Sequence, residues 1–221
     1  MDINDMRSNY NLDNLMREDL QGNPFDQFVA WFDAAVKAAV LEPNAMTLST
    51  VSKEGKPSSR MVLMKGLDHK GLIFYTNLQS RKSREIMDTS FVSINFFWKE
   101  LQRQVVIEGI AEKLERQESE AYFSSRPRGS QLSAWTSAQG QIISSREALD
   151  QAYNDLEAHY DGKPVPMPEF WGGFRIIPHR FEFWQGRPDR LHDRFQYVPV
   201  PSDRFQYTQN PAGWQIDRLA P

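Results

Sequence analysis

The sequence predicts a mainly β protein with peripheral helices, folded as an antiparallel, closed or split β-barrel. Two observations carry this prediction. Apolar and polar residues alternate with a period of two over several separate stretches, and these stretches follow one another without a βαβ rhythm. Because the strands are mostly antiparallel and the helices lie outside them, closure into a barrel is favoured, since closure removes exposed sheet edges.

Length and composition predict a single core. A chain of 221 residues with 40% hydrophobic content can bury one substantial core. The first 22 residues are polar and without periodicity, which is typical of an arm that becomes ordered only when something holds it. We therefore expect an N-terminal arm over residues 1–22 and one domain over residues 23–221.

Helical order begins at Asn23, which is a suitable N-cap, and Pro24 suits the first helical position. Apolar residues then recur at spacings of three, four and seven, which predicts a helix with one buried face; they are Phe25, Phe28, Val29, Phe32, Val36 and Val40. The period next changes to two, and Ser80 can cap a short basic helix over residues 81–87. Strands are predicted at residues 46–51, 58–67, 72–76, 91–98 and 103–114.

The C-terminal half begins with a capping box, Ser144 with Glu147, which predicts a helix as far as Tyr160. A proline-rich connector over residues 164–168 follows it. Strands are predicted at residues 175–184, 195–207 and 214–219. The pentapeptide at residues 193–197 returns at 203–207, which we interpret as a local duplication within a hairpin.

Composition excludes several classes of function. A formal net charge of −3, with both signs interspersed, gives no general attraction for nucleic acid or an anionic membrane. The absence of Cys excludes disulfides and thiolate catalysis, and the four His are too far apart to suggest a metal site. With no long apolar run and a polar, acidic N-terminus, we expect a cytoplasmic protein. Motifs for dinucleotides, P-loops, hydrolase elbows and zincins are missing.

Basic residues placed among strands and aromatic residues suit phosphate binding. Arg60 and Lys65 flank four apolar residues, and a separation of five places them on opposite faces of a strand, so they need not serve one group. Arg81 and Lys82 lie just inside a helix N-terminus, where backbone amides already favour an anion. The alternative for Arg60 and Lys65 is a pair of strand-end charges that reach water, and the alternative for Arg81 and Lys82 is a solvated basic turn.

Two further segments concentrate donors. Residues 122–130 bring a phenol, two guanidiniums and several hydroxyls into a bend that resembles a second anion site, although an ordinary helix-to-loop exit is the alternative. In an extended strand Arg190, His192 and Arg194 point the same way, and three such side chains repel one another unless an anion joins them. Trp184 lies nearby in the sequence and can contact a planar ring.

In these features the chain resembles the pyridoxine/pyridoxamine 5′-phosphate oxidase family of FMN-binding split barrels. The resemblance runs from about Met6 to Pro221 and depends on the order of several separated stretches. These are residues 60–65, 74–77, 80–82, 103–105, 122–127, 169–175, 183–186, 190–194 and 216–221.

The resemblance implies a set of ligand contacts. The FMN contacts would be Arg60, Met61, Val62, Leu63, Met64, Lys65, Tyr75, Thr76, Arg81, Lys82, Gln104, Gln139, Gly140, Trp184 and Arg194. The FMN phosphate would lie among Arg60, Arg81 and Lys82. The substrate phosphate would be held by Lys65, Tyr122, Arg126 and Ser130, while Arg190, Leu191 and His192 would lie at the pyridine ring, with Arg190 and His192 as the catalytic pair.

The resemblance also implies a homodimer with FMN at the subunit interface, and an arm that closes over substrate through Arg7 and Tyr10. The implied reaction oxidises pyridoxine or pyridoxamine 5′-phosphate to pyridoxal 5′-phosphate, with O₂ as acceptor and H₂O₂ released. Two features depart from the family pattern. Gly140 stands where a Ser is common, and Arg204 in the second pentapeptide competes with Arg194 for one flavin-facing position. The alternatives are a split barrel that binds FMN or pyridoxal phosphate without turnover, and a reductase that uses another flavin.

Overall fold

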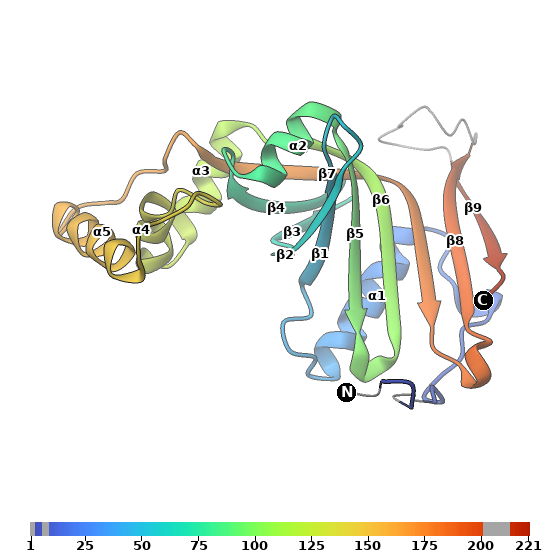
Figure 1. The fold of residues 1–221 in the computed structure, drawn as a ribbon. Helices are drawn as coiled ribbons and strands as arrows, with labels where there is room; N and C mark the ends of the chain where they lie inside the picture. Colours follow the sequence, from blue (N-terminus) through green and yellow to red (C-terminus); the bar gives the residue numbers. More distant parts are fainter. Residues whose placement is uncertain (1–2, 6–8, 201–212) are drawn as a thin grey trace.

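A computed structural model describes residues 3–5, 9–200 and 213–221, and within these residues nine strands form one antiparallel sheet (Figure 1). The strands are β1 Ala45–Val51, β2 Pro57–Leu63, β3 Gly66–Asp68, β4 Gly71–Asn77, β5 Phe91–Trp98, β6 Arg103–Lys113, β7 Trp171–Gln185, β8 Asp193–Val200 and β9 Gly213–Leu219. The helices are α1 Pro24–Lys37, α2 Arg81–Thr89, α3 Arg116–Ser125, α4 Arg128–Thr136 and α5 Arg146–His159, with short 3-10 turns at Arg17–Asp19, Lys99–Leu101 and Pro188–Arg190. The predicted mainly β, antiparallel split barrel with peripheral helices is confirmed.

The long strand β7 divides the barrel into two parts. Its first part pairs with β4 and its last part with β8, while β6 runs beside both. The register between β6 and β7 shifts between Glu108 and Gly109, opposite Pro178. A side chain at Gly109 would place its Cβ only 2.3 Å from the Ile177 carbonyl oxygen, so the close approach at this bulge requires glycine.

Helix α1 covers the inside of the curled sheet. Asn23 caps it by accepting a hydrogen bond of 2.9 Å from the Phe25 amide, as predicted. Phe28 packs edge-on against Phe96, and Trp31 against Phe183. The helix ends at Lys37, before the predicted Val40. Its buried face also includes Trp31 and Ala35, whereas Val29 and Val36, which were expected inside, are 44% and 52% exposed.

The predicted strand over residues 58–67 is wrong in one respect, because the chain changes partner within it. Strand β2 pairs with β1 and ends at Leu63. The Met64 amide then donates to Asn44, and the Lys65 amide donates to Ile73 of β4. Strand β3 continues beside β4 from Gly66, so Lys65 lies between two strands rather than within one.

Helices α3, α4 and α5 form a lobe at the end of the molecule away from β8 and β9 (Figure 1). Its small core contains Phe123, Met167 and Trp171. Sequence reasoning predicted α5 but named no helix over α3 or α4. For residues 122–130 it expected a bent, donor-rich segment with a helix-to-loop exit as the alternative, and α3 does end there, at Ser125. The predicted cap at Ser144 is also wrong: the Ser145 side chain accepts a hydrogen bond from the Ala148 amide at 3.2 Å, because this serine stands three residues before that donor.

The stretch from Arg190 to Arg194 is not the single extended strand that the sequence suggested. Residues 188–190 form a 3-10 turn in which Asp189 and Arg190 have positive φ angles of 56° and 62°. Strand β8 begins only at Asp193, so Arg190 does not share a strand face with His192 and Arg194. The second pentapeptide at residues 203–207, including Arg204 and the end of the predicted strand 195–207, lies outside the described residues.

The described part of the N-terminal arm joins the main core. Leu15 and Leu20 are 3% and 9% exposed and pack within the same cluster as the barrel residues. None of the helices in the described part of the chain has the length and apolar content needed to cross a membrane.

Candidate active site

A cavity of about 1000 Å³ opens between β2, β4, α2 and α4. Most of the predicted ligand contacts line it. These are Arg60, Met61, Val62, Leu63, Lys65, Tyr75, Thr76, Arg81, Lys82, Tyr122, Arg126, Ser130, Gln139 and Gly140. Met64 does not, because its side chain is 8% exposed and belongs to the main core.

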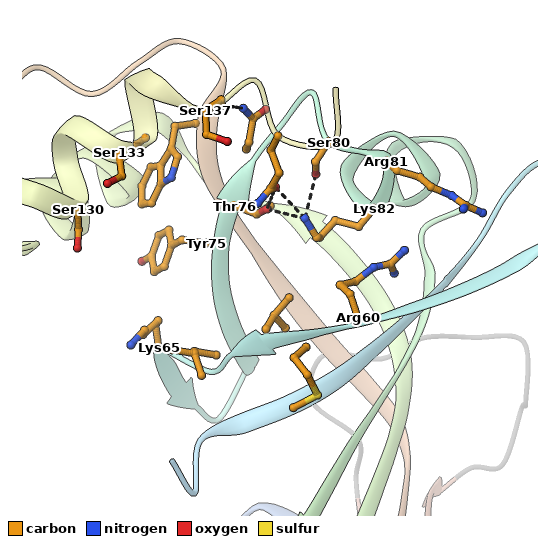
Figure 2. A pocket seen from close by; sticks show the side chains of 18 of the residues that line it. Arg60, Lys65, Tyr75, Thr76, Ser80, Arg81, Lys82, Ser130, Ser133 and Ser137 are labelled. Carbon is orange, nitrogen blue, oxygen red and sulfur yellow. Dashed lines mark hydrogen bonds between the residues drawn. The ribbon is translucent and has the colours of Figure 1, made fainter. Parts of the chain in front are cut away.

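Three cationic side chains gather at one end of the cavity (Figure 2). Arg81 and Lys82 occupy the first turn of α2, and Arg60 approaches from β2. The Lys82 ammonium donates to Thr76 at 3.1 Å, to Ser80 at 3.2 Å and to Gln139 at 2.9 Å, all of them uncharged acceptors. Burial, together with the nearby Arg60, lowers the pKa of Lys82 to about 8. Three cations beside the N-terminus of a helix can hold an anion at this end of the cavity.

Glu85, which sequence reasoning missed, holds two of these cations from one helical turn further along α2. Its carboxylate accepts from the Arg81 Nε at 2.8 Å and lies 3.6 Å from the Arg60 Nη2. Burial raises the pKa of Glu85, but hydrogen bonds from Thr50, Ser58 and Arg81 outweigh this effect and lower it to about 2. The spacing of four from Arg81 was the available sequence signal.

The other end of the cavity is aromatic, with one isolated guanidinium. The Tyr75 ring stacks on Tyr122 at 4.0 Å and on Trp171 at 5.4 Å between ring centroids. The Arg126 guanidinium lies 4.8 Å from the centroid of the Trp171 ring. Its Nη1 is buried and has no hydrogen-bond partner among the described residues, so an anionic ligand would satisfy it. Trp171, which builds this wall, was not predicted as a site residue.

Arg60 and Lys65 both line the cavity, although the sequence placed them on opposite faces of one strand. Lys65 reaches the cavity because it follows the end of β2. In Figure 2 it lies beside Tyr75, across the cavity from Arg60 and Arg81. The two cations are thus available to two different groups.

A second group of predicted residues lies outside this cavity. Gln104, Trp184 and Arg194 pair directly across β6, β7 and β8, so their side chains form a row on one face of the sheet. Glu182, another residue that sequence reasoning missed, holds Arg194 in this row. Its Oε1 accepts from the Arg194 Nε at 2.9 Å and Nη2 at 2.7 Å, while its Oε2 accepts from Arg180 at 2.7 Å.

His192 lies next to this row. Its ring centroid is 4.6 Å from Trp184 and 5.9 Å from Tyr10 of the arm. The Arg187 amide donates to the His192 Nδ1 at 3.1 Å, so the neutral ring carries its proton on Nε2. Burial, and then Arg190 and Arg194, lower the pKa of His192, while Asp193 opposes them. Near neutral pH His192 therefore offers an Nε2–H donor.

The remaining predicted residues lie on the surface or outside the described residues. Arg190 is exposed, Leu191 is 69% exposed, and neither lines the cavity. Arg7 lies outside the described residues. The predicted site residues are thus divided between the cavity and a separate group around Trp184 and His192 in the same chain.

Two family profiles match the parts of the chain that contain these two groups of residues. The profile of the pyridoxamine 5′-phosphate oxidase family matches residues 32–160, which include every lining residue of the cavity except Trp171. The profile of the pyridoxine 5′-phosphate oxidase C-terminal dimerisation region matches residues 171–221, which include Trp184, His192 and Arg194. The chain belongs to the pyridoxamine 5′-phosphate oxidase family. The resemblance predicted from the sequence is confirmed.

Curated members of the pyridoxamine 5′-phosphate oxidase family match the whole chain. A protein named pyridoxine/pyridoxamine 5′-phosphate oxidase from Crocosphaera subtropica is 48% identical over 221 residues, covering 100% of both chains. One of the same name from Bordetella pertussis is also 48% identical over 100% of both chains.

Solved structures share the fold of this oxidase family. PhzG from Burkholderia lata, in complex with tetrahydrophenazine-1-carboxylic acid, is 31% identical with a TM-score of 0.84, covering 95% of this chain and 99% of its own. An FMN-binding protein from Nostoc punctiforme, 14% identical with a TM-score of 0.69 over 91% of this chain and 100% of its own, shares the fold.

Proposed function

We propose that the protein is an FMN-dependent oxidase of pyridoxine or pyridoxamine 5′-phosphate that forms pyridoxal 5′-phosphate with O₂ as electron acceptor. The main support is the cavity, which has groups that suit an anion at each end. The chain also matches proteins named pyridoxine/pyridoxamine 5′-phosphate oxidase over its full length. Two anion sites suit a phosphorylated cofactor and a phosphorylated substrate held side by side.

The residues at the α2 end of the cavity fit the FMN phosphate. Arg60, Arg81 and Lys82 provide three cations, and the first turn of α2 provides backbone amides. Gln139 and Thr76 already accept hydrogen bonds from Lys82, so they hold its ammonium at this end. When bound there, FMN would supply the two-electron redox chemistry: it would take up the hydride that leaves the substrate C4′ carbon and would be reoxidised by O₂, which with two electrons and two protons becomes H₂O₂.

The aromatic end fits the substrate phosphate. The buried Arg126 Nη1 lacks a partner among the described residues, and Lys65, Tyr122 and Ser130 line the same cavity. Arg190 and His192 then act on the pyridine ring, with Arg190 at the C4′ substituent and the His192 Nε2–H as a donor that orients the ring. These residues position the reacting carbon rather than supply a general base.

The active form is a homodimer in which each site takes residues from two subunits. Gln104, Trp184, His192 and Arg194 do not line the cavity of their own chain, and most of them fall in the region matched by the dimerisation profile. Phe97, which pairs with Gln104 at the edge of the same row, is 50% exposed and is an apolar surface for a second copy to cover.

The first experiment tests the reaction. The purified protein should be yellow, and addition of pyridoxine 5′-phosphate should release H₂O₂ and pyridoxal 5′-phosphate in equal amounts. Unphosphorylated pyridoxine is the control, because it cannot use the anion site at Arg126. A yellow protein that produces neither product would refute the oxidase and favour a flavin-binding protein without turnover.

The second experiment tests the shared site. Arg126→Ala and Arg190→Ala homodimers should both be inactive with pyridoxine 5′-phosphate. In a heterodimer of the two variants, one site combines the intact cavity of one subunit with the intact Arg190 of the other. Co-expression should therefore restore about half of the wild-type activity per heterodimer, whereas sites formed within single subunits would stay inactive.

A further inference from the structure

Asp193 lies between His192 and Arg194 in the sequence, but on β8 it shares the buried face with Phe195 and Tyr197, whereas Arg194 lies on the other face. It is the first residue of β8 and is 9% exposed. Its Oδ1 accepts from the Arg218 Nη1 at 2.7 Å. Its Oδ2 accepts from the Leu15 amide at 3.2 Å and lies 3.6 Å from the Arg187 Nε. One buried carboxylate thus joins the arm, β9 and the turn before His192.

Both backbone polar groups of Leu15 in the arm form hydrogen bonds to this carboxylate or to its arginine partner. Asp193 accepts from the Leu15 amide, and Arg218 donates to the Leu15 carbonyl at 3.4 Å. Arg218 is itself held 4.4 Å from the centroid of the Phe195 ring. The backbone of Leu15 is therefore fastened to β8 and β9 by a charged pair, while its side chain lies in the core.

This contact fixes the part of the arm that reaches the predicted substrate site. The Asn11 and Leu12 amides donate to the Gln102 side chain at 3.0 and 3.3 Å, and Asp13 forms a 2.7 Å ion pair with Arg103. These contacts hold the neighbouring Tyr10 beside His192 and Trp184. A side chain at Gly186 would approach the Tyr10 Cβ to 2.8 Å, so glycine permits this docking.

Arg187 connects the same carboxylate to His192. Its Nε lies 3.6 Å from Asp193, its side chain donates to the Asp13 carbonyl at 3.5 Å, and its amide donates to the His192 Nδ1 at 3.1 Å. The carboxylate that holds the arm therefore also holds the residue that sets the His192 tautomer.

We infer that Asp193 is a positioning residue that couples docking of the N-terminal arm to the orientation of His192. The expected effect on the KM rests on the proposed function, whereas the expected effect on docking of the arm rests on the hydrogen bonds of Leu15 alone. Arg194 is held by a different carboxylate, Glu182, so Asp193 should act on substrate binding and not on FMN binding.

The test uses Asp193→Asn in the FMN-loaded full-length protein. Hydrogen exchange of the peptide that contains Leu15 should become about tenfold faster, because a charge-assisted acceptor is lost. The KM for pyridoxine 5′-phosphate should rise about tenfold, with kcat and FMN affinity each within about twofold of wild type. Asp217→Asn is the matched control on β9, since Asp217 accepts only from the Gln196 and Gln215 side chains in the described part of the chain.

A second variant, Arg218→Gln, removes the partner of Asp193, and it changes a half-exposed side chain. It should also make hydrogen exchange of the Leu15 peptide faster and raise the KM for pyridoxine 5′-phosphate. It also decides the question if Asp193→Asn fails to fold. Arm exchange as slow as in Asp217→Asn, in whichever variant folds, would overturn the inference. A wild-type protein without oxidase activity would refute the proposed function instead, and the exchange rates would still decide whether Asp193 fastens the arm.

Discussion

The pKa of Lys82 predicts how FMN affinity depends on pH. Lys82 is 8% exposed, and its ammonium is held by neutral acceptors, so burial lowers its pKa to about 8 in the free protein. A bound phosphate dianion opposes this loss of charge and raises the pKa again. FMN therefore binds the charged form of Lys82. At a pH where Lys82 of the free protein is neutral, binding must be accompanied by uptake of a proton.

The magnitude follows from the same pKa of about 8. The dissociation constant of FMN is multiplied by a factor of 1 + 10^(pH − 8). This factor is about 1.1 at pH 7 and about 11 at pH 9. FMN should thus bind about tenfold more weakly at pH 9 than at pH 7, a difference of about 1.4 kcal/mol.

The assay is titration of flavin-free protein with FMN, followed by quenching of flavin fluorescence between pH 6.5 and 9. Lys82→Arg keeps its charge throughout this range and should give a flat profile. Riboflavin, which lacks the phosphate, should also bind with little pH dependence. A flat profile for wild type, or an equal slope for Lys82→Arg, would refute a phosphate contact through a Lys82 of lowered pKa.

Three further predictions concern residues around the two ligand groups. Arg190→Ala should lower kcat strongly while flavin absorbance stays with the protein; release of the flavin would show that this side chain serves the cofactor. Glu182→Gln should weaken FMN and riboflavin by the same factor, about tenfold, since it frees Arg194 rather than a phosphate contact, and a loss confined to FMN would contradict this. Glu85→Gln should remove about 3 kcal/mol of unfolding free energy at pH 7, measured by urea titration. Because the folded-state pKa of Glu85 is depressed to about 2, the difference should vanish as pH falls from 4.5 towards 2, and a constant difference would count against it.

The barrel strands were predictable because their signal is local. Alternation with a period of two records which face of a strand is buried, and β1 and β5 alternate in burial as the sequence suggests. Helices α3 and α4 escaped prediction because they bury little: α3 has two buried residues and α4 one. Such helices lack a broad apolar stripe, and the small lobe core depends on Met167 and Trp171, which are distant in sequence.

Cations of the candidate site could be found in the sequence, whereas the carboxylates that hold them could not. Arg81 and Lys82 are adjacent, and residues 122–130 form a short cluster. Glu182 reaches Arg194 through strand register, 12 residues away, and Asp193 reaches the Leu15 amide through packing of the arm, 178 residues away. Glu85, four residues after Arg81 on the same helix, left a local signal.

Taken alone, the sequence determined the fold class, the family and the chemistry of the cavity, because alternation, composition and ordered motifs are properties of neighbouring residues. Tertiary structure decided three other features: the change of strand at Lys65, the turn that separates Arg190 from β8, and the division of the predicted site into two groups. These depend on which distant segments pair and pack. Free energies of register, burial and ion pairing are set by such contacts and not by any single stretch of chain.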